Sequence, residues 1–423
     1  MNPQLQEQSN LTSAQWNKLR RLLTYASTKV PYYRSMFDRL KVNPHDIDSL
    51  EKFSQLPSQK KQTIQQQWND FISEDYEIKD LVLNNTSGST GIPMKVAQTR
   101  AELTIAGRHF MRERMRWGVS QPTRWAMVGD VLDFVNGNTD LVRRKPRGGG
   151  EELMLHWDLK PSTIYQYLRE LEAFQPVWIY SYPPMMERMA QFMLSNGISI
   201  ELRDIRLIEL AGEYLSPQVR EDVTRAFGYK PASEYACREL WGIAFECPEG
   251  GMHVMTDHVL LEIVKDNGTP AAPGETGEAI VTGLNNWSMP FIRYRLGDVL
   301  MPLDEKCSCG DPRPLIRVMG GRVANFMFGR HNRLGDLTFN LIVRHLYDNG
   351  YQGIQEYRVV QRSEILFEVW IVRTPAWAPV IQKLFTEKVQ SMLGSDIQLD
   401  FKFVDTIPLS PAGKSKPFVV DLL

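Results

Sequence analysis

Residues 86–96 read Thr-Ser-Gly-Ser-Thr-Gly-Ile-Pro-Met-Lys-Val, and they follow the short apolar run Leu81-Val82-Leu83. The run from Thr86 to Gly91 contains only hydroxyl-bearing residues and glycine. A loop of this composition after a strand can offer backbone N–H groups and hydroxyl donors to phosphate oxygens, with Lys95 as a nearby positive charge. It lacks the Gly-Lys-Ser/Thr ending of a Walker loop. The stretch therefore predicts either a phosphate-binding loop of another kind or a flexible turn.

The segments around this loop predict an α/β fold. Apolar residues recur at helical spacing over 14–39, with an interruption at Pro31. Further along, helical segments alternate with short strands, which is typical of a parallel sheet covered by helices. The expected helices are 162–174 and 184–196, and the expected strands are 81–85, 176–180 and 207–211.

The pattern changes after Gly251 to strands separated by turns, which predicts a β-rich subdomain. Beyond Gly329, two helices and three strands predict a small α+β domain. The expected strands are 259–264, 278–284, 292–296, 357–361, 365–372 and 397–404, and the expected helices are 337–346 and 380–392. We expect a helical lead-in at 1–80, a large domain at 81–322 and a small, mobile C-terminal domain at 323–423.

Composition narrows the function classes. The chain has 423 residues, which at roughly 150 residues per domain is enough for about two to three domains. Lys and Arg total 49 against 50 for Asp and Glu, so the net charge is −1, and any anionic ligand must be held by local charge rather than by a whole-molecule field. No run approaches the roughly 18 apolar residues of a membrane span, and the first residues lack the pattern of a secretory signal. We expect a soluble cytoplasmic protein that binds neither nucleic acid nor membranes.

The loop at 86–93 resembles the phosphate-binding signature T-S-G-S-T-G-x-P of the adenylate-forming enzymes, the superfamily of acyl-CoA synthetases. Further motifs of that superfamily follow in the same order: Leu210–Glu213, Glu234–Glu239, Met289–Asp298, Gly321–Arg322 and Pro408–Lys414. The branch of phenylacetate-CoA ligases and related deazaflavin-adenylylating synthetases is the most similar one. That narrower likeness rests on Tyr25–Tyr33, on Phe245–Cys247 and on Gly251–His253.

This resemblance implies ATP, Mg²⁺ and CoA as cofactors and a small carboxylic acid, with an aromatic acid among the candidates, as substrate. A carboxylate and a triphosphate repel each other, so the site needs cations and N–H donors, and no covalent nucleophile on the protein is required. The resemblance places Glu239 at Mg²⁺, Asp298 at the ribose hydroxyls, and Lys414 at the charge that develops when the carboxylate attacks the α-phosphate. It assigns the other nucleotide contacts to Thr86, Ser87, Gly88, Ser89, Thr90, Gly91, Lys95, Gly212, Glu213, Tyr235 and Arg322, with Gly212 and Tyr235 at the adenine ring. We count Arg238 with Glu239 and Lys414 as a candidate catalytic residue.

Two positions depart from the superfamily pattern. Arg238 stands beside the phosphates where Thr or Ser is usual, and Ala324 stands where a hinge aspartate is usual. The first half-reaction is therefore better supported than the transfer to CoA. Two alternatives stay open: adenylation with an amine or another cofactor as acceptor, and a catalytically silent nucleotide-binding protein.

The four cysteines are too few for a disulfide framework in a chain of this length. Cys307 and Cys309 form a C-x-C pair, and Cys247 and His253 can supply two further ligands to a tetrahedral zinc ion. Similar positions occur in some members of the resembled branch. With four protein ligands such a site is closed and structural. The alternative is a set of reduced thiols with an unrelated histidine.

Three histidines, His109, His156 and His258, lie in or beside apolar segments and are interpreted as structural. Aromatic residues such as Tyr180, Tyr182, Trp241 and Phe245 can shape a carboxylate pocket or pack in the core. A homodimer is suggested only by analogy with the branch.

Overall fold

The computed structural model describes residues 11–86, 94–121, 123–130, 140–157, 159–319, 326–328, 333–335, 337–407 and 418–420. The chain forms two compact units, each built from separate stretches of sequence. The first unit comprises Met1–Asn84, Met94–Arg116 and Glu234–Arg322. The second comprises Asn85–Pro93, Trp117–Ser233 and Val323–Leu423.

The first unit begins with the helical lead-in. Thr12 caps α2 (Ser13–Lys29) in a capping box with Gln15, and Pro31 starts α3 (Pro31–Leu40), as the interruption at Pro31 predicts. Apolar residues of both helices pack in one core with the strands of this unit. The remaining helical elements are α4 (Leu50–Ser54), α5 (Lys61–Gln66), α6 (Arg100–Arg116) and the 3₁₀ turns Pro44–Asp46, Trp68–Phe71 and Ile78–Asp80.

An antiparallel sheet in the order β11-β12-β13-β14-β10-β9-β8 forms the β-rich part of the first unit. Its strands are β8 (Ala232–Cys237), β9 (Trp241–Glu246), β10 (Met252–Val254), β11 (Val259–Val264), β12 (Gly277–Gly283), β13 (Tyr294–Leu303) and β14 (Leu315–Val318). The sequence predicts β13 from residue 292, but the strand begins at Tyr294 because the backbone of Arg293 is left-handed, with φ 52°. A separate pair, β1 (Val82–Asn85) and β2 (Lys95–Gln98), lies on either side of residues 87–93 in the sequence.

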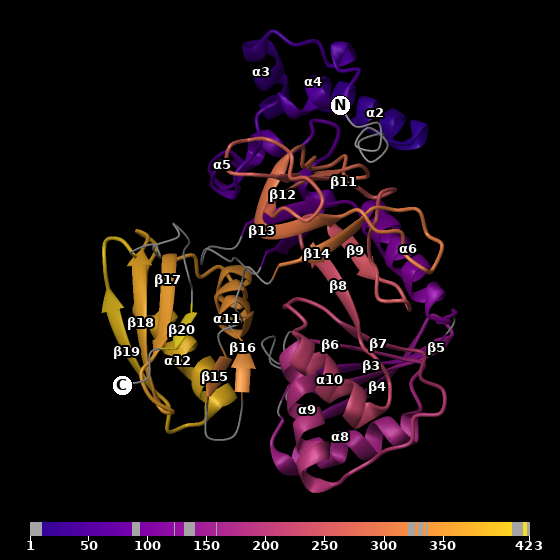
Figure 1. Ribbon diagram of the computed structural model, residues 1–423. Coiled ribbons are helices and arrows are strands. Elements are labelled where there is room, and N and C mark those ends of the chain that lie inside the picture. The colour runs from indigo at the N-terminus through magenta and orange to yellow at the C-terminus, as the bar shows by residue number, and fades with distance from the viewer. Residues whose placement is uncertain are drawn as a thin grey trace. The chain divides into compact units, whose positions relative to one another are not determined.

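The central part of the second unit is a sheet in the order β8-β7-β6-β3-β5-β4, in which only β4 and β5 run antiparallel. Helices α8, α9 and α10 lie over its strands (Figure 1). Buried Ala126, Ile179 and Ile208 pack with helix residues such as Leu168 and Met189 in the same core. The strands are β3 (Arg124–Asp130), β4 (Val142–Arg147), β5 (Gly150–His156), β6 (Trp178–Ser181) and β7 (Leu207–Leu210), and the helices are α8 (Pro161–Phe174), α9 (Pro183–Asn196) and α10 (Pro217–Phe227).

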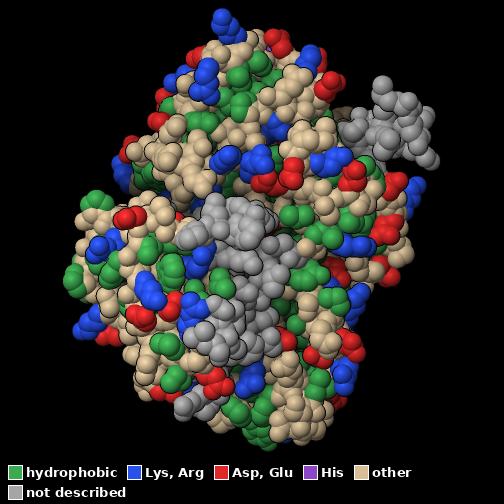
Figure 2. Space-filling model, turned by 60° about the vertical axis from the view of Figure 1, so that its left-hand side comes forward, with side chains coloured by type: hydrophobic (Ala, Val, Ile, Leu, Met, Phe, Trp, Pro, Cys, Tyr) green, Lys and Arg blue, Asp and Glu red, His purple; other side chains and the backbone are tan. Residues whose placement is uncertain are grey.

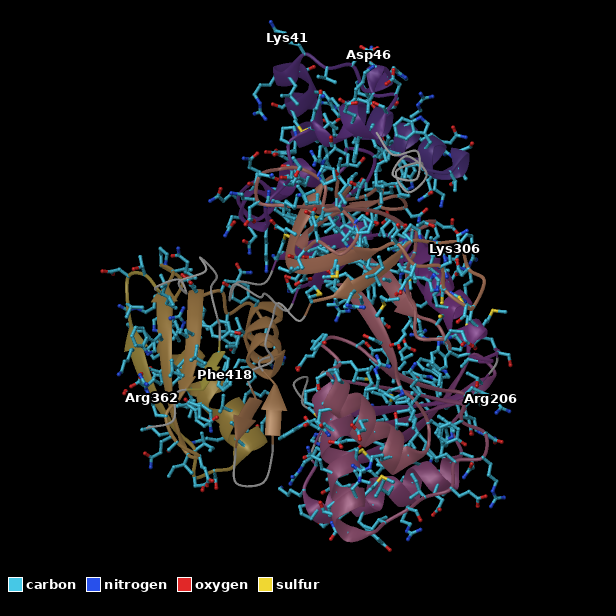
Figure 3. The ribbon with its side chains drawn as sticks, in the orientation of Figure 1. Lys41, Asp46, Arg206, Lys306, Arg362 and Phe418 are labelled. Carbon is cyan, nitrogen blue, oxygen red and sulfur yellow. The ribbon has the colours of Figure 1, made fainter. Side chains whose placement is uncertain are left out.

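The C-terminal part of the second unit contains a four-stranded sheet in the order β19-β18-β17-β20, together with α11 and α12. Phe339 on α11 packs against Phe385, Phe367 and Phe418. Figure 3 labels Phe418 and Arg362 in this part, and Arg362 pairs with Glu368 at 3.0 Å. The elements are β15 (Phe326–Phe328), β16 (Arg333–Gly335), α11 (Leu337–Asp348), β17 (Ile354–Gln361), β18 (Leu366–Arg373), α12 (Pro379–Leu393), β19 (Gln398–Phe403) and β20 (Phe418–Val420). The predicted fold class, with parallel strands covered by helices, a β-rich subdomain and a small α+β part, is confirmed.

Charged side chains of both signs are interspersed over the described residues of the face in Figure 2, in keeping with the net charge of −1. Within the described ranges, every helix is too short or too polar to cross a bilayer.

Candidate active site and metal cluster

The hairpin between β8 and β9 carries Glu239, the residue that the resemblance places at Mg²⁺. The carboxylate is buried, with 7% of the residue exposed, and its Oε1 accepts a hydrogen bond of 2.8 Å from the hydroxyl of Tyr294 at the start of β13. Its backbone carbonyl faces the side-chain amides of Gln98 and Asn286, each at 3.4 Å. These partners come from three other segments of the first unit, so they fix both the backbone and the carboxylate of Glu239.

A second pair joins the same two motifs. The hydroxyl of Tyr235 on β8 donates to Oδ2 of Asp298 on β13 at 2.9 Å. Both side chains are half-buried. The fold therefore brings the residues expected at the adenine ring and at the ribose into direct contact.

The turn of this hairpin is held in an unfavourable conformation. Trp241 has φ 65°, a left-handed backbone that costs a bulky residue about 1–2 kcal/mol. Its indole N–H donates to Oε1 of Gln98 at 3.0 Å, and the guanidinium of Arg238 lies over its ring at 5.0 Å from the centroid. A cation–π contact with Trp241 therefore positions the guanidinium of Arg238, the residue that departs from the superfamily pattern, at this hairpin.

Cys237 lies in the same hairpin, and burial, with the neighbouring charge of Glu239, raises the pKa of its thiol well above the ordinary value. A thiol that stays protonated is a poor nucleophile. This environment agrees with a site in which no covalent nucleophile on the protein is required.

The lead-in tyrosines and one motif arginine support the segment before β13. The hydroxyl of Tyr33 donates to the carbonyl of Pro290 and accepts from the N–H of Ile292, both at 3.0 Å. Arg293 bonds the carbonyls of Ser54 and Leu56 and pairs with Glu262 at 3.0 Å. Arg293 therefore joins the lead-in to the sheet and has a structural role.

Other predicted nucleotide contacts are distributed over both units. Thr86 is buried, and Lys95 is exposed at the start of β2. Gly212 follows β7 with φ 80°, next to half-buried Glu213, and both belong to the second unit. Ser87, Gly88, Ser89, Thr90, Gly91, Arg322 and Lys414 lie outside the described residues, as does the departing position Ala324.

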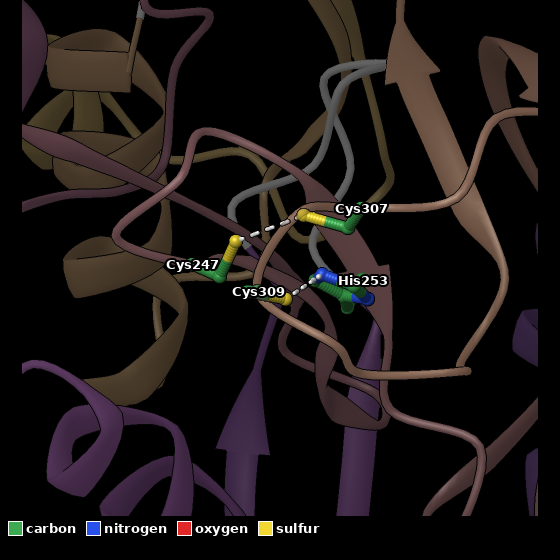
Figure 4. Close-up of side chains that lie close together, drawn as sticks. All are labelled: Cys247, His253, Cys307 and Cys309. Carbon is green, nitrogen blue, oxygen red and sulfur yellow. Dashed lines mark hydrogen bonds between the residues drawn. The ribbon is translucent and has the colours of Figure 1, made fainter.

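The fold brings together the four residues proposed as metal ligands, although 62 positions separate the first from the last (309 − 247). Cys247 follows β9, His253 lies on β10, and Cys307 and Cys309 lie in the loop before β14 (Figure 4). Their ligand atoms all lie within 4.8 Å of one another. The Sγ atoms of Cys247 and Cys307 are 3.6 Å apart, and Sγ of Cys309 is 3.3 Å from Nε2 of His253.

The electrostatics of the cluster favour a neutral imidazole. Burial lowers the pKa of His253, and its Nδ1 lies 3.3 Å from the carbonyl of Arg313, which leaves Nε2 toward the sulfur atoms. Burial raises the pKa of Cys247 to about 11. Burial also acts to raise the pKa of Cys309, but the N–H of Asp311, the neighbouring thiols and the Arg116 guanidinium together lower it.

Sequence reasoning did not identify several residues of these sites: Tyr294, Gln98 and Asn286 around Glu239, and Glu113, Arg116 and Arg313 around the cysteines. Tyr294 stands in a recognised motif, so its position was a usable signal. Gln98 and Glu113 have no local signal for these roles, because the partners that place them at the two sites, Glu239 and Arg313, lie 141 and 200 positions away.

The chain is similar in sequence to one family model and to several known proteins. A family model described as the CapK C-terminal domain matches residues 335–421. The phenylacetate-coenzyme A ligase of Thermus thermophilus is 26% identical over 306 residues, which are 71% of this chain and 67% of that protein. Protein CapK of Staphylococcus aureus is 21% identical over 420 residues, 97% of this chain and 90% of that protein.

Among solved structures, 2-hydroxyisobutyryl-CoA ligase in complex with 2-HIB-AMP and CoA aligns with a TM-score of 0.64 and 17% identity, over 99% of this chain and 92% of that one. An open conformation of the same ligase aligns with a TM-score of 0.60. These structural matches establish the fold. Together with the sequence matches they confirm that the chain resembles the adenylate-forming superfamily, in its phenylacetate-CoA ligase-like branch.

Proposed function

We propose that the chain is an ATP-dependent, AMP-forming acid–CoA ligase. In the first half-reaction a carboxylate oxygen of the acid attacks the α-phosphorus of ATP, and pyrophosphate leaves. In the second, the thiolate of CoA attacks the carbonyl carbon of the acyl-adenylate, and AMP leaves with the electron pair of the broken bond. The similarity to phenylacetate-coenzyme A ligases over 71% of the chain supports this reaction class.

The observation that carries the proposal is the convergence of two motifs on β8 and β13. The Tyr294 hydroxyl bonds Glu239 at 2.8 Å, and the Tyr235 hydroxyl bonds Asp298 at 2.9 Å. Glu239 keeps its second carboxylate oxygen for a cation, and oxygen ligands are what Mg²⁺ prefers. Mg²⁺, when bound there, would neutralise phosphate charge, while Asp298 would accept hydrogen bonds from the ribose.

The remaining roles belong to the same proposal. Thr86, Ser87, Gly88, Ser89, Thr90, Gly91 and Lys95 would bind the phosphates, and Gly212 and Glu213 would line the adenine site, with Arg322 near the ribose. Arg238 would add a positive charge beside the phosphates. Lys414 would stabilise charge in the transition state more than in the ground state, and so would affect rate more than ATP binding. The division into 1–80, 81–322 and 323–423, the cytoplasmic location and the homodimer stay predictions.

The proposal also concerns the molecule that accepts the acyl group. The CapK C-terminal model covers residues 335–421, the part of the chain that contains Lys414. An amine or another cofactor stays the alternative acceptor to CoA. Incubation of the chain with ATP, a panel of acids and either CoA or candidate amines, followed by product mass, separates the two. A thioester mass supports CoA, whereas an amide without any thioester would contradict it.

We also propose a structural zinc ion at Cys247, His253, Cys307 and Cys309. Two ligands at about 2.3 Å from Zn²⁺ in tetrahedral geometry lie roughly 3.8 Å apart, and the observed separations of 3.6 and 3.3 Å are close to that edge. A Cβ atom on Gly251 would approach Sγ of Cys307 to 2.8 Å and Nε2 of His253 to 3.1 Å, so a larger residue there would displace two of the four ligand atoms. Metal analysis of purified protein tests the proposal. A protein that contains no zinc and is as stable as the same protein with zinc added would refute it.

A further inference from the structure

The last turn of α6 ends directly on the cysteine cluster. Nη2 of Arg116 donates to Sγ of Cys309 at 3.1 Å. Nη1 of the same guanidinium pairs with Oδ2 of Asp311 at 2.8 Å and with Oε2 of Glu113 at 3.2 Å. One side chain of α6 therefore contacts a metal ligand and two carboxylates at once.

Arg313 completes the connection on the other side of the cluster. Its guanidinium binds both carboxylate oxygens of Glu113 at 2.7 Å each, and it also pairs with Asp311 at 2.6 Å. Its backbone carbonyl faces Nδ1 of His253 at 3.3 Å. We call Glu113, Arg116, Asp311 and Arg313 the α6 network. Glu113, at its centre, is 1% exposed.

A directed N–H donor, rather than net charge, connects the α6 network to this cluster. Three thiolates and one neutral imidazole around Zn²⁺ leave one net negative charge. Within the α6 network the two arginines balance the two carboxylates, and Arg116 directs one N–H at Cys309. Hydrogen bonds of this kind orient a ligand and stabilise its charged form.

We propose that Arg116 is a positioning residue of the metal site, that the α6 network holds the Cys309 thiolate and the His253 ring in coordinating geometry, and that bound metal in turn fastens the last turn of α6. This inference rests on the proposed structural zinc. Loss of an outer-shell partner typically costs about 10- to 100-fold in metal affinity, and we expect that loss for Arg116→Gln.

The test measures Zn²⁺ affinity by competition with a chromophoric chelator, and thiolate coordination by the absorption of substituted Co²⁺. The variants are Arg116→Gln and Arg116→Lys, which keeps a positive charge without the planar fork. Arg108→Gln is the matched control, because Arg108 is an exposed arginine two turns earlier on the same helix and lies outside the α6 network. Amide hydrogen exchange over residues 110–116, with and without Zn²⁺, is the second readout.

We expect Arg116→Gln to lose about 10- to 100-fold in Zn²⁺ affinity, Arg116→Lys to lose part of that, and Arg108→Gln to stay near the parent protein. Zn²⁺ should slow exchange at the end of α6 in the parent protein but not in Arg116→Gln. If the parent protein binds one Zn²⁺ and Arg116→Gln binds it equally well, this inference is wrong and the structural zinc stands. If the parent protein binds no Zn²⁺, the proposed zinc itself fails. Failure of both Arg116 variants to fold would also overturn the inference, since the network would then serve folding rather than the metal.

Discussion

Replacing Tyr294 by phenylalanine tests the link between the two motifs with a single atom. The Tyr294→Phe change removes the hydroxyl that bonds Oε1 of Glu239 at 2.8 Å and keeps the ring, which is 3% exposed and packs edge-on against Phe291. The side chain of Glu239 would lose the donor that fixes its orientation. We therefore expect weaker Mg²⁺·ATP use with little loss of stability.

The expected size of the Tyr294→Phe effect follows from the strength of the lost hydrogen bond. A bond to a charged group contributes about 1.5–3 kcal/mol. At about 1.4 kcal/mol per factor of ten, its loss corresponds to roughly 10- to 150-fold. The Mg²⁺ concentration required for half-maximal adenylation should rise by this factor.

The assay is carboxylate-dependent pyrophosphate release over a Mg²⁺ titration at fixed ATP. Tyr229→Phe is the matched control, because that hydroxyl bonds the carbonyl of Leu202 at 2.9 Å in the second unit. The reasoning would be refuted by a Tyr294→Phe enzyme with the Mg²⁺ dependence of the parent protein and of the control.

Three further predictions address the metal, pH and the lysine. Gly251→Ala should lower Zn²⁺ affinity at least about 10-fold, because its Cβ would meet Cys307 and His253, while Gly268→Ala, at an open turn, should leave that affinity unchanged. Equal Zn²⁺ affinities of the two variants in a chelator competition would contradict the proposed zinc site. Burial, with the neighbouring His258, lowers the pKa of His109 to about 4, and burial lowers that of His258. Folding therefore favours the neutral rings, and stability present above pH 6.5 should be lost as the pH falls toward about 4. The full shift of His109 corresponds to roughly 3 kcal/mol, and its partial exposure to solvent reduces the expected loss to about 2 kcal/mol. Lys18, Arg112 and Asp257 also face this pair, so His109→Gln should reduce the loss in urea unfolding at pH 4.5 relative to pH 7, and an identical loss in both proteins would refute the assignment. Lys414→Ala should reduce adenylate formation by roughly two or more orders of magnitude with ATP binding kept, and unchanged kinetics would remove its assigned role.

Local patterns predicted most of the elements but few of the partnerships. The apolar periodicity near Pro31 and in α9 follows from burial on one face, and both helices form within a residue or so of the expected bounds. The strand at 292–296 was placed too early, because an arginine at φ 52° leaves no trace in hydrophobic spacing. Side-chain partners of Glu239 depend on how distant segments meet, and that is set by packing of the whole unit rather than by neighbours in sequence.

The cysteine cluster shows the same difference between local patterns, which the sequence reveals, and distant side-chain partners, which it does not. The C-x-C spacing indicated half of a metal site, and Cys247 and His253, which are six residues apart, were the candidates for the other half. The fold brings all four residues together. Arg116 and Glu113 look like ordinary charged residues of a helix, yet Glu113 is buried and bonded to Arg313. A charged side chain of a helix can thus be buried when another chain segment supplies its counter-charge.

Incorporation of labelled pyrophosphate into ATP, measured with and without a panel of carboxylic acids, tests most directly whether this chain activates an acid. The account predicts exchange that requires both Mg²⁺ and an acid and that falls in the Tyr294→Phe variant. Bound ATP without exchange for any acid of a broad aromatic and aliphatic panel would contradict it, and would identify the chain as a nucleotide-binding protein without ligase activity.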